Sequence, residues 1–254
     1  MEVGLDPESF GDPAEAFAHL HARFGRRATL VDRYELEAAV RGVGPDDLDS
    51  ELRARLALEV IPMQIPGWTV VGSAERTFSD PIEVVPYDEA WATLFADWRR
   101  ALVDALGVTA VRVEHVGSTA VPGLAAKPIV DIQVGVRDVD DEHLYARAIE
   151  HLGVALRSRD PGHRYFRPAG DRPRTVQMHV IAVGSTWERE HLLFRDFLRA
   201  NEVMRDAYGR LKLELARRYR DDRFAYNEAK TGFVLDALED AEAWAVRVGW
   251  SIGR

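Results

Sequence analysis

The stretch from Val113 to Val136, VEHVGSTAVPGLAAKPIVDIQVGV, most constrains what this chain can fold into. Two runs rich in β-branched residues flank a loop with two glycines and one lysine, and such runs favour β-strands. In the second run, apolar residues alternate with Asp131, Gln133 and Gly135, which therefore share one face of the strand. Because the apolar face should be buried, we expect Asp131 to face a cleft or solvent.

A second strand of the same kind is expected at residues 176–183. Alternation places Gln177 and His179 on one face of it, together with Ile181 and Val183. If this strand lies beside residues 129–136 in register, Asp131 and His179 can share a site.

Strands and helices are mixed along the chain in an order that indicates an α+β fold with one mixed β-sheet flanked by helices. A helix is predicted at 88–106, where Trp91, Leu94, Phe95, Trp98, Leu102 and Leu106 recur at helical spacing. The other expected helices are 140–152, 187–219 with an interruption, and 226–246. The expected strands are 68–71, 82–86, 109–116, 129–136, 153–167 in one or two pieces, and 175–183.

Residues 1–80 are predicted to form a small helical N-terminal extension and a linker. Helical patterns between residues 14 and 61 precede a stretch rich in Pro and Gly, and we place a domain boundary near Asp80. A cap over the cleft and a self-association surface are the two roles that these helices suit. Residues 81–254 then form the second domain.

The composition excludes several classes of function. The chain has no cysteine, so any metal must be held by oxygen or imidazole ligands. A formal net charge of −9 argues against general nucleic-acid binding. No stretch approaches the roughly 20 apolar residues that span a bilayer, and the N-terminus lacks the features of a signal peptide. We expect a cytoplasmic protein without membrane association, and the sequence predicts no particular protein partner.

The loop after the first strand begins with Gly117 and Ser118. A Gly-Ser pair at a strand end can present amide hydrogens and a hydroxyl to a phosphate, and Lys127 would add a positive charge nearby. An ordinary turn explains the same pair equally well. The spacing of Gly117, Gly123 and Lys127 does not match GxxxxGK[ST], which excludes a P-loop.

Four separated motifs carry a resemblance to a known family. They are IEVVPYDEAW (82–91), EHVGSTAVPGLAAKPIVDI (114–132), HLLFRDFLRAN (191–201) and YNEAKTGFV (226–234). In this order they resemble the GrpB family over about residues 82–245. That family is similar to the nucleotidyltransferase superfamily, in which a Gly-Ser pair precedes a strand whose two carboxylates bind Mg²⁺ ions and a nucleoside triphosphate.

The resemblance implies roles for particular residues. Gly117 and Ser118 would contact phosphate, and Asp131 would be the first metal carboxylate, holding Mg²⁺ or Mn²⁺. The second carboxylate is expected two residues later, where this chain has Gln133, and His179 is the nearest candidate on the third strand. Two-metal chemistry needs several negative oxygen ligands, so a single ion held by Asp131, His179 and Glu114 is the other arrangement considered. The catalytic candidates are Asp131 and His179.

Four basic residues are candidates for binding a phosphorylated substrate: Lys127, Arg164, Arg195 and Lys230. Arg164 lies in HRYFR, and arginine beside aromatic rings suits a phosphate and a stacked base. A solvated hairpin and loose surface ion pairs are the alternatives for these charges.

Two functions follow from these residues. The first is an enzyme that transfers a nucleotidyl or phosphoryl group to a small acceptor. The second is a non-catalytic module that binds a nucleotide or a phosphorylated metabolite, and Gln133 favours it. GrpB-like domains also resemble a part of proteins in which they are fused to dephospho-CoA kinase. This sequence lacks the P-loop of that kinase domain.

Overall fold

The computed structural model describes residues 69–71, 81–160, 162–168 and 172–253 of this 254-residue chain. The helices expected between residues 14 and 61 and the boundary near Asp80 lie outside the described residues.

The described part of the chain is built around one six-stranded mixed sheet with the strand order β1-β4-β5-β6-β3-β2. Only the central pair β3 and β6 is parallel, and every other neighbouring pair is antiparallel. This confirms the expected α+β class. The strands are β1 (Thr69–Val70), β2 (Arg112–Val116), β3 (Val130–Val136), β4 (Val154–Asp160), β5 (His163–Pro168) and β6 (Val176–Ala182).

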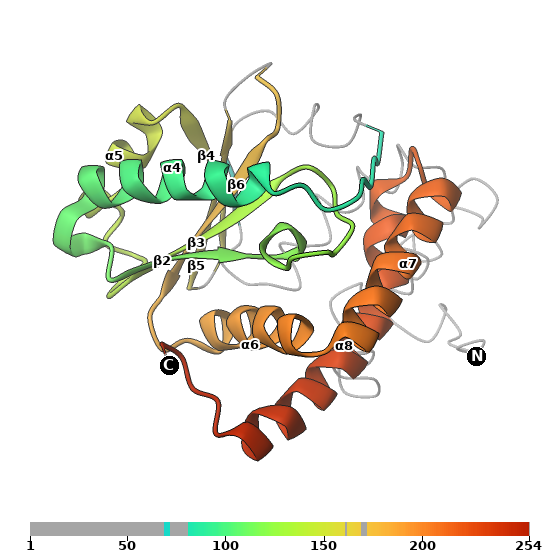
Figure 1. Ribbon diagram of the computed structural model, residues 1–254. Helices are drawn as coiled ribbons and strands as arrows, with labels where there is room; N and C mark the ends of the chain where they lie inside the picture. Colours follow the sequence, from blue (N-terminus) through green and yellow to red (C-terminus); the bar gives the residue numbers. More distant parts are fainter. Residues whose placement is uncertain (1–68, 72–80, 161, 169–171, 254) are drawn as a thin grey trace, which may run out of the picture.

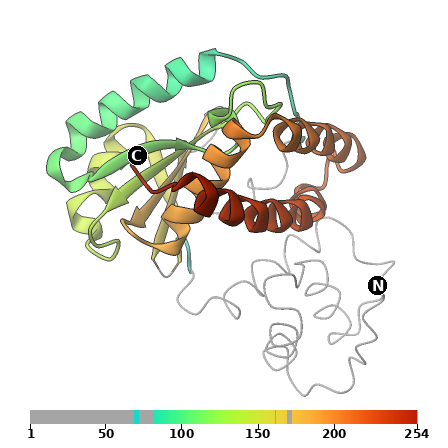
Figure 2. The same ribbon diagram turned by 60° about the horizontal axis from the view of Figure 1, so that its bottom comes forward.

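Helices cover both faces of the sheet, as Figure 1 shows. On one face lie α4 (Ala90–Leu106) and α5 (Ala146–His151), which pack against the apolar residues of the strands. On the other lies α6 (Thr186–Ala200), followed by α7 (Glu202–Arg218) and α8 (Arg223–Val248). Figure 2 shows α8 passing beside α6 and α7, with which it shares a second apolar cluster. Short 3₁₀ turns occupy Gly107–Thr109, Ser118–Ala120 and Glu142–Leu144.

Local sequence explains where the helices begin and end. The Asp88 carboxylate accepts a hydrogen bond from the backbone N–H of Ala90 at 2.8 Å, which supports the first turn of α4. Ser185, Asn201 and Asp222 each cap the helix that follows them. The Asn201 cap is the interruption expected between residues 187 and 219, because a side chain that binds the Met204 N–H starts a new helix there.

Alternation along β3 orients the site. Val130, Ile132, Val134 and Val136 are buried with at most 1% of their surface exposed, on the face covered by α4 and α5. Asp131 and Gln133 therefore lie on the face toward α6. The same alternation along β6 buries Val176, Met178 and Val180 in that core.

Two expected elements are wrong in extent. Residues 82–86 form no strand; Val85 makes an isolated bridge to Ala126, and Pro86 cannot extend it because it lacks an N–H. The helix expected at 140–152 is shortened to α5, preceded by a 3₁₀ turn. The cause is Tyr145, whose ring is buried and whose hydroxyl donates to the Val139 carbonyl, so that the backbone there leaves helical geometry.

No helix in the described ranges combines the length and apolar character that crossing a bilayer requires.

Candidate functional site

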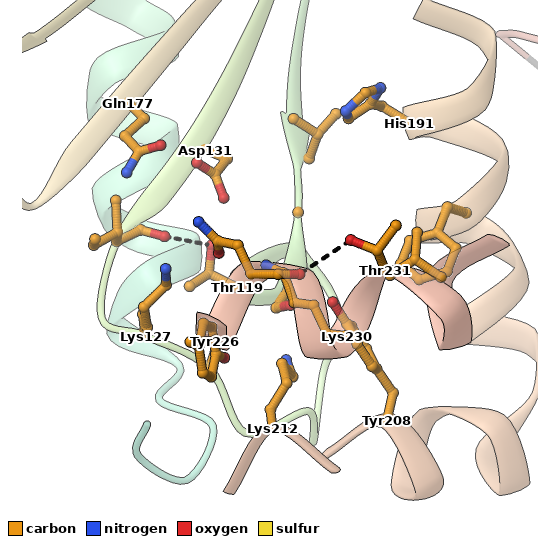
Figure 3. A pocket seen from close by; sticks show the side chains of 18 of the residues that line it. Thr119, Lys127, Asp131, Gln177, His191, Tyr208, Lys212, Tyr226, Lys230 and Thr231 are labelled. Carbon is orange, nitrogen blue, oxygen red and sulfur yellow. Dashed lines mark hydrogen bonds between the residues drawn. The ribbon is translucent and has the colours of Figure 1, made fainter. Parts of the chain in front are cut away.

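A cavity of about 460 Å³ opens between the α6 face of the sheet, the loop before β3, and helices α6, α7 and α8. Figure 3 shows the side chains that converge on it. Six of the expected site residues line it. They are Gly117, Ser118, Lys127, Asp131, His179 and Lys230.

Asp131 and His179 are brought together as the alternation of their strands predicts. In the parallel pair, Asp131 lies opposite Gln177. His179 lies opposite Gln133, two residues further along both strands. His179 Nε2 is 3.8 Å from Asp131 Oδ1, and both side chains are half-buried. The juxtaposition is confirmed, and the separation is longer than a hydrogen bond.

The loop geometry at Gly117 holds the backbone against this carboxylate. Gly117 has φ +70°, and a Cβ there would collide with Oδ2 of Asp131. Glycine is therefore required both by the left-handed backbone and by the close approach. Ser118 follows at the cavity wall, which Tyr208 also lines.

Three lysines project into the cavity from three different elements (Figure 3). Lys127 comes from the loop before β3, Lys212 from α7 and Lys230 from α8. These are the three lysines of the whole chain, which otherwise takes its positive charge from arginine. Among the described residues that line the cavity, Asp131 is the only one with a carboxylate.

The ammonium groups lie over tyrosine rings. Lys127 Nζ and Lys230 Nζ are 5.1 and 5.3 Å from the centre of the Tyr226 ring, and Lys212 Nζ is 4.5 Å from that of Tyr208. Lys212 is 3% exposed, and its Nζ has no hydrogen-bond partner among the residues that the structure describes. Aromatic faces attract cations but do not pair with them as a carboxylate does, so these lysines can still pair with an anionic ligand.

Burial depresses the pKa values of all three lysines, and repulsion by other lysines adds to the effect at Lys127 and Lys212. Burial first, and then the charge of Lys230, lowers the pKa of Lys127 to about 7. Burial together with Lys230 and Lys127 brings the pKa of Lys212 well below its ordinary value. The pKa of Lys230 is lowered by burial too, while Asp131 opposes the shift. Such a cluster is stabilised by an anion that enters it.

Arg164 lies on the opposite face of the sheet from the cavity. It pairs with Val180 across β5 and β6, and its guanidinium donates to Glu142 and Asp140 at 2.5 Å each. The backbone carbonyls of Asp160 and His163 accept its remaining hydrogen bonds. These contacts engage all three guanidinium nitrogens of Arg164, so we do not assign it to the substrate.

Arg195 is likewise occupied by protein partners, away from the residues that line the cavity. It donates to Glu114 Oε2 at 2.7 Å, to Asp196 at 2.7 Å and to the carbonyl of His115 at 3.0 Å. The contacts tie α6 to β2. The contact with Arg195 also engages the carboxylate of Glu114, the third ligand of the single-ion site that the sequence suggests.

The donors around Asp131 do not fit a resident Mg²⁺ or Mn²⁺ ion. Gln133, at the position of the second carboxylate, is 1% exposed and does not line the cavity. Within the described ranges, no three His, Asp or Glu side chains are grouped so that they could hold a metal. The lysines add further repulsion, since hard cations require several negative oxygens.

Several residues that line the cavity were not predicted from the sequence. Lys212 had one signal: it lies four residues after Tyr208 and three before Leu215, on the buried stripe of α7. A lone charge on an apolar stripe points to a site. Arg174, Tyr208, Tyr226 and Asn227 also line the cavity and carried no such signal.

Comparison with known proteins places the chain in a family. The family model described as GrpB protein matches residues 81–240. A UPF0157 protein of Streptomyces coelicolor is 46% identical over 149 residues, covering 59% of this chain and 78% of that one. A protein of Mycobacterium bovis named dephospho-CoA kinase is 31% identical over 200 residues, covering 67% of this chain and 48% of that one.

A solved structure agrees with these matches. The crystal structure of the conserved protein GrpB from Enterococcus faecalis superposes with a TM-score of 0.58 at 33% sequence identity. It covers 64% of this chain and 99% of the other. The motifs, the family match and the shared fold lead to one conclusion: this chain belongs to the GrpB family.

Proposed function

We propose that the cavity binds a small molecule that carries several phosphate groups, either a nucleotide or a phosphorylated metabolite. The observation that carries the proposal is the placement of all three lysines of the chain in one cavity, whose described lining has a single carboxylate. Three neighbouring ammonium groups repel one another, and a ligand with several negative charges removes that repulsion for all of them at once.

The size and composition of the cavity support a small ligand. Its volume lies within the roughly 300–1,000 Å³ that is typical of small-molecule sites. Tyr208 and Tyr226 add aromatic surface beside the lysines, and Asn227 adds an amide that can fix an orientation. The net charge of −9 disfavours an extended polyanion such as nucleic acid, because the rest of the surface would repel it.

The resemblance to nucleotidyltransferases and the relative named dephospho-CoA kinase guide the choice of probes. The first group is inorganic tripolyphosphate, ATP, ADP, AMP and adenosine. The second is coenzyme A and dephospho-coenzyme A. Each is tested with Mg²⁺ and with EDTA.

Thermal unfolding of the full chain tests the proposal. A probe at a hundredfold its Kd adds about 2.7 kcal/mol, and each kcal/mol raises the Tm of a chain of this size by about 2–4 °C. We expect the shift to grow with the number of phosphates, to vanish for adenosine and to be the same in EDTA.

Two charge-removing variants serve as test and control. Lys127→Met should lose the shift, whereas Arg100→Met, which removes an exposed charge on α4, should retain it. Equal shifts in the two variants, or no shift with any probe, would contradict the proposal.

A second candidate, transfer of a phosphoryl or nucleotidyl group, is favoured by the pair Asp131 and His179 beside the lysines. In such a step the oxygen of an acceptor hydroxyl attacks phosphorus and gives its proton to a base of the site. The bond from phosphorus to the departing phosphate breaks, and the electron pair leaves with that phosphate. ³¹P NMR of a nucleoside triphosphate with a hydroxyl acceptor detects this reaction, and an Asp131→Asn variant that turns over as the parent does excludes Asp131 from it.

A further inference from the structure

Four side chains form a line that runs from the end of β4 to the cavity. Asp160 Oδ2 lies 2.6 Å from His163 Nδ1, and His163 Nε2 lies 2.9 Å from His179 Nδ1. His179 Nε2 then faces Asp131 Oδ1 at 3.8 Å. The line joins four strands, because Asp160 ends β4, His163 begins β5, His179 lies in β6 and Asp131 in β3.

The two rings are held by aromatic neighbours. His163 and His179 stack with 5.2 Å between their centres, and Trp187 of α6 lies 5.2 Å from His163 and 5.1 Å from His179. Tyr165 covers His179 from β5 at 5.4 Å. The His163 side chain is 13% exposed and that of His179 is 18% exposed. Neither ring can turn over without disturbing its neighbours, so their hydrogen bonds have defined partners.

The distances determine where the protons lie when both rings are neutral. A contact of 2.6 Å between an imidazole nitrogen and a carboxylate oxygen requires a proton between them, which places one on His163 Nδ1. His163 Nε2 is then an acceptor, and the 2.9 Å contact places the proton of His179 on Nδ1. His179 Nε2 is left without a proton. Burial, the first cause, lowers the pKa of His163 and favours its neutral ring.

We propose that His179 Nε2 is the proton acceptor of this cavity, and that Asp160 and His163 are positioning residues which keep that nitrogen unprotonated. The proposal rests on the proposed function in one respect, because the hydroxyl that supplies the proton must be held next to a phosphorylated ligand. The rest of the proposal concerns the tautomer, which exists in the ligand-free protein.

The geometry at Asp131 suits an acceptor hydroxyl. The 3.8 Å between His179 Nε2 and Asp131 Oδ1 leaves room for one hydroxyl, whose single proton is donated to Nε2. As that oxygen forms its bond to phosphorus, its proton moves to Nε2 and gives an imidazolium. Asp160 and His163 stabilise the imidazolium through the other ring nitrogen, and the lysines hold the charge of the departing phosphate.

His191 of α6 provides an internal reference ring at the same cavity. Its Nδ1 donates to the Trp187 carbonyl at 2.9 Å, and burial lowers its pKa to about 4. Because a carbonyl can only accept, His191 also has a bare Nε2. Its tautomer depends on α6 alone, and it should not respond to changes at Asp160.

Nitrogen NMR of the full chain at pH 8, with ¹⁵N-labelled histidine, reads the tautomers directly. The chain has eight histidines, and His179→Gln and His163→Gln variants assign the two signals. We expect the His179 signal to report protonated Nδ1 and bare Nε2. Asp160→Ala should shift the His163 and His179 signals toward a mixture of tautomers, while the His191 signal stays unchanged. A parent spectrum with the proton of His179 on Nε2, or an Asp160→Ala spectrum identical to that of the parent, overturns the proposal.

Titration of the same samples with inorganic tripolyphosphate separates this proposal from the proposed function. Asp160 and His163 do not line the cavity that holds the lysines. We therefore expect Asp160→Ala to bind tripolyphosphate as the parent does. Failure of the parent to bind refutes the proposed function and leaves the tautomer result standing. Normal binding by a parent protein in which His179 carries its proton on Nε2 refutes only the proposed role of His179, Asp160 and His163.

Discussion

The backbone of Gly117 packs directly against the carboxylate of Asp131. The loop reaches this position with φ +70° at Gly117, and a Cβ there would collide with Oδ2. The pair therefore couples the shape of the loop to the orientation of the carboxylate. Any residue other than glycine must move one or the other.

We expect Gly117→Ala to lower the free energy of unfolding by about 1–3 kcal/mol, since it combines a strained backbone with a steric clash. Gly184→Ala is the matched control. Gly184 has φ +78°, but a Cβ there meets no atom of the described residues within 4 Å, so only the cost of the backbone, about 1 kcal/mol, should remain. Urea denaturation of both variants measures the difference, and equal losses would show that the contact with Asp131 costs nothing.

The stability of the ligand-free protein should rise between pH 7 and pH 10. The folded pKa of Lys127 is about 7 and its ordinary value is 10.5, so the unfolded chain binds more protons than the folded one in this window. The free energy of unfolding then increases with pH, by at most about 1.4 kcal/mol per pH unit for one group. Lys127→Met should flatten the profile measured by urea denaturation at several pH values. A parent profile that falls over this range would contradict the lowered pKa.

Lys212→Met should stabilise the ligand-free protein while removing affinity for phosphates. The lysine is 3% exposed and has no hydrogen-bond partner in the described part of the chain, and burying its charge or its amine costs free energy that methionine avoids. We expect a gain of about 1–2 kcal/mol in urea denaturation. A loss of stability would indicate that Lys212 supports the fold and not a ligand.

Arg164→Met should reduce stability without reducing affinity for tripolyphosphate. The variant removes hydrogen bonds to Glu142 and Asp140 on the far side of the sheet, at a cost of about 1–3 kcal/mol. Arg100→Met, which breaks an exposed ion pair with Asp97, should cost less than about 0.5 kcal/mol. Loss of tripolyphosphate binding in the Arg164 variant would indicate that Arg164 takes part in ligand binding.

Strand alternation predicted that Asp131 and His179 lie near each other, as they do in the structure. The period of two in residues 129–136 and 176–183 was enough to place Asp131 and His179 on one face, because a buried strand leaves no freedom over which side chains point inward. The apolar stripe of α4 predicted that helix in the same way, from Trp91 to Leu106.

Other features depended on contacts that no local pattern contains. Arg164 follows a histidine that belongs to the cavity side, and only the register with Val180 shows that the arginine lies on the other face. The helix expected at 140–152 is shortened by the hydroxyl of Tyr145, which finds the Val139 carbonyl only in the folded chain. The convergence of Lys127, Lys212 and Lys230 likewise requires three elements to pack together.

Isothermal titration of the full chain with inorganic tripolyphosphate, in buffer with EDTA, tests the central claim most directly. We predict binding to one site without any divalent cation, with affinity reduced by about tenfold or more in Lys212→Met, since one charged hydrogen bond contributes about 1.5–3 kcal/mol. Arg100→Met should bind as the parent does. Binding that requires Mg²⁺, or that is unchanged when Lys212 is replaced, would contradict a cavity in which the lysines hold the phosphates.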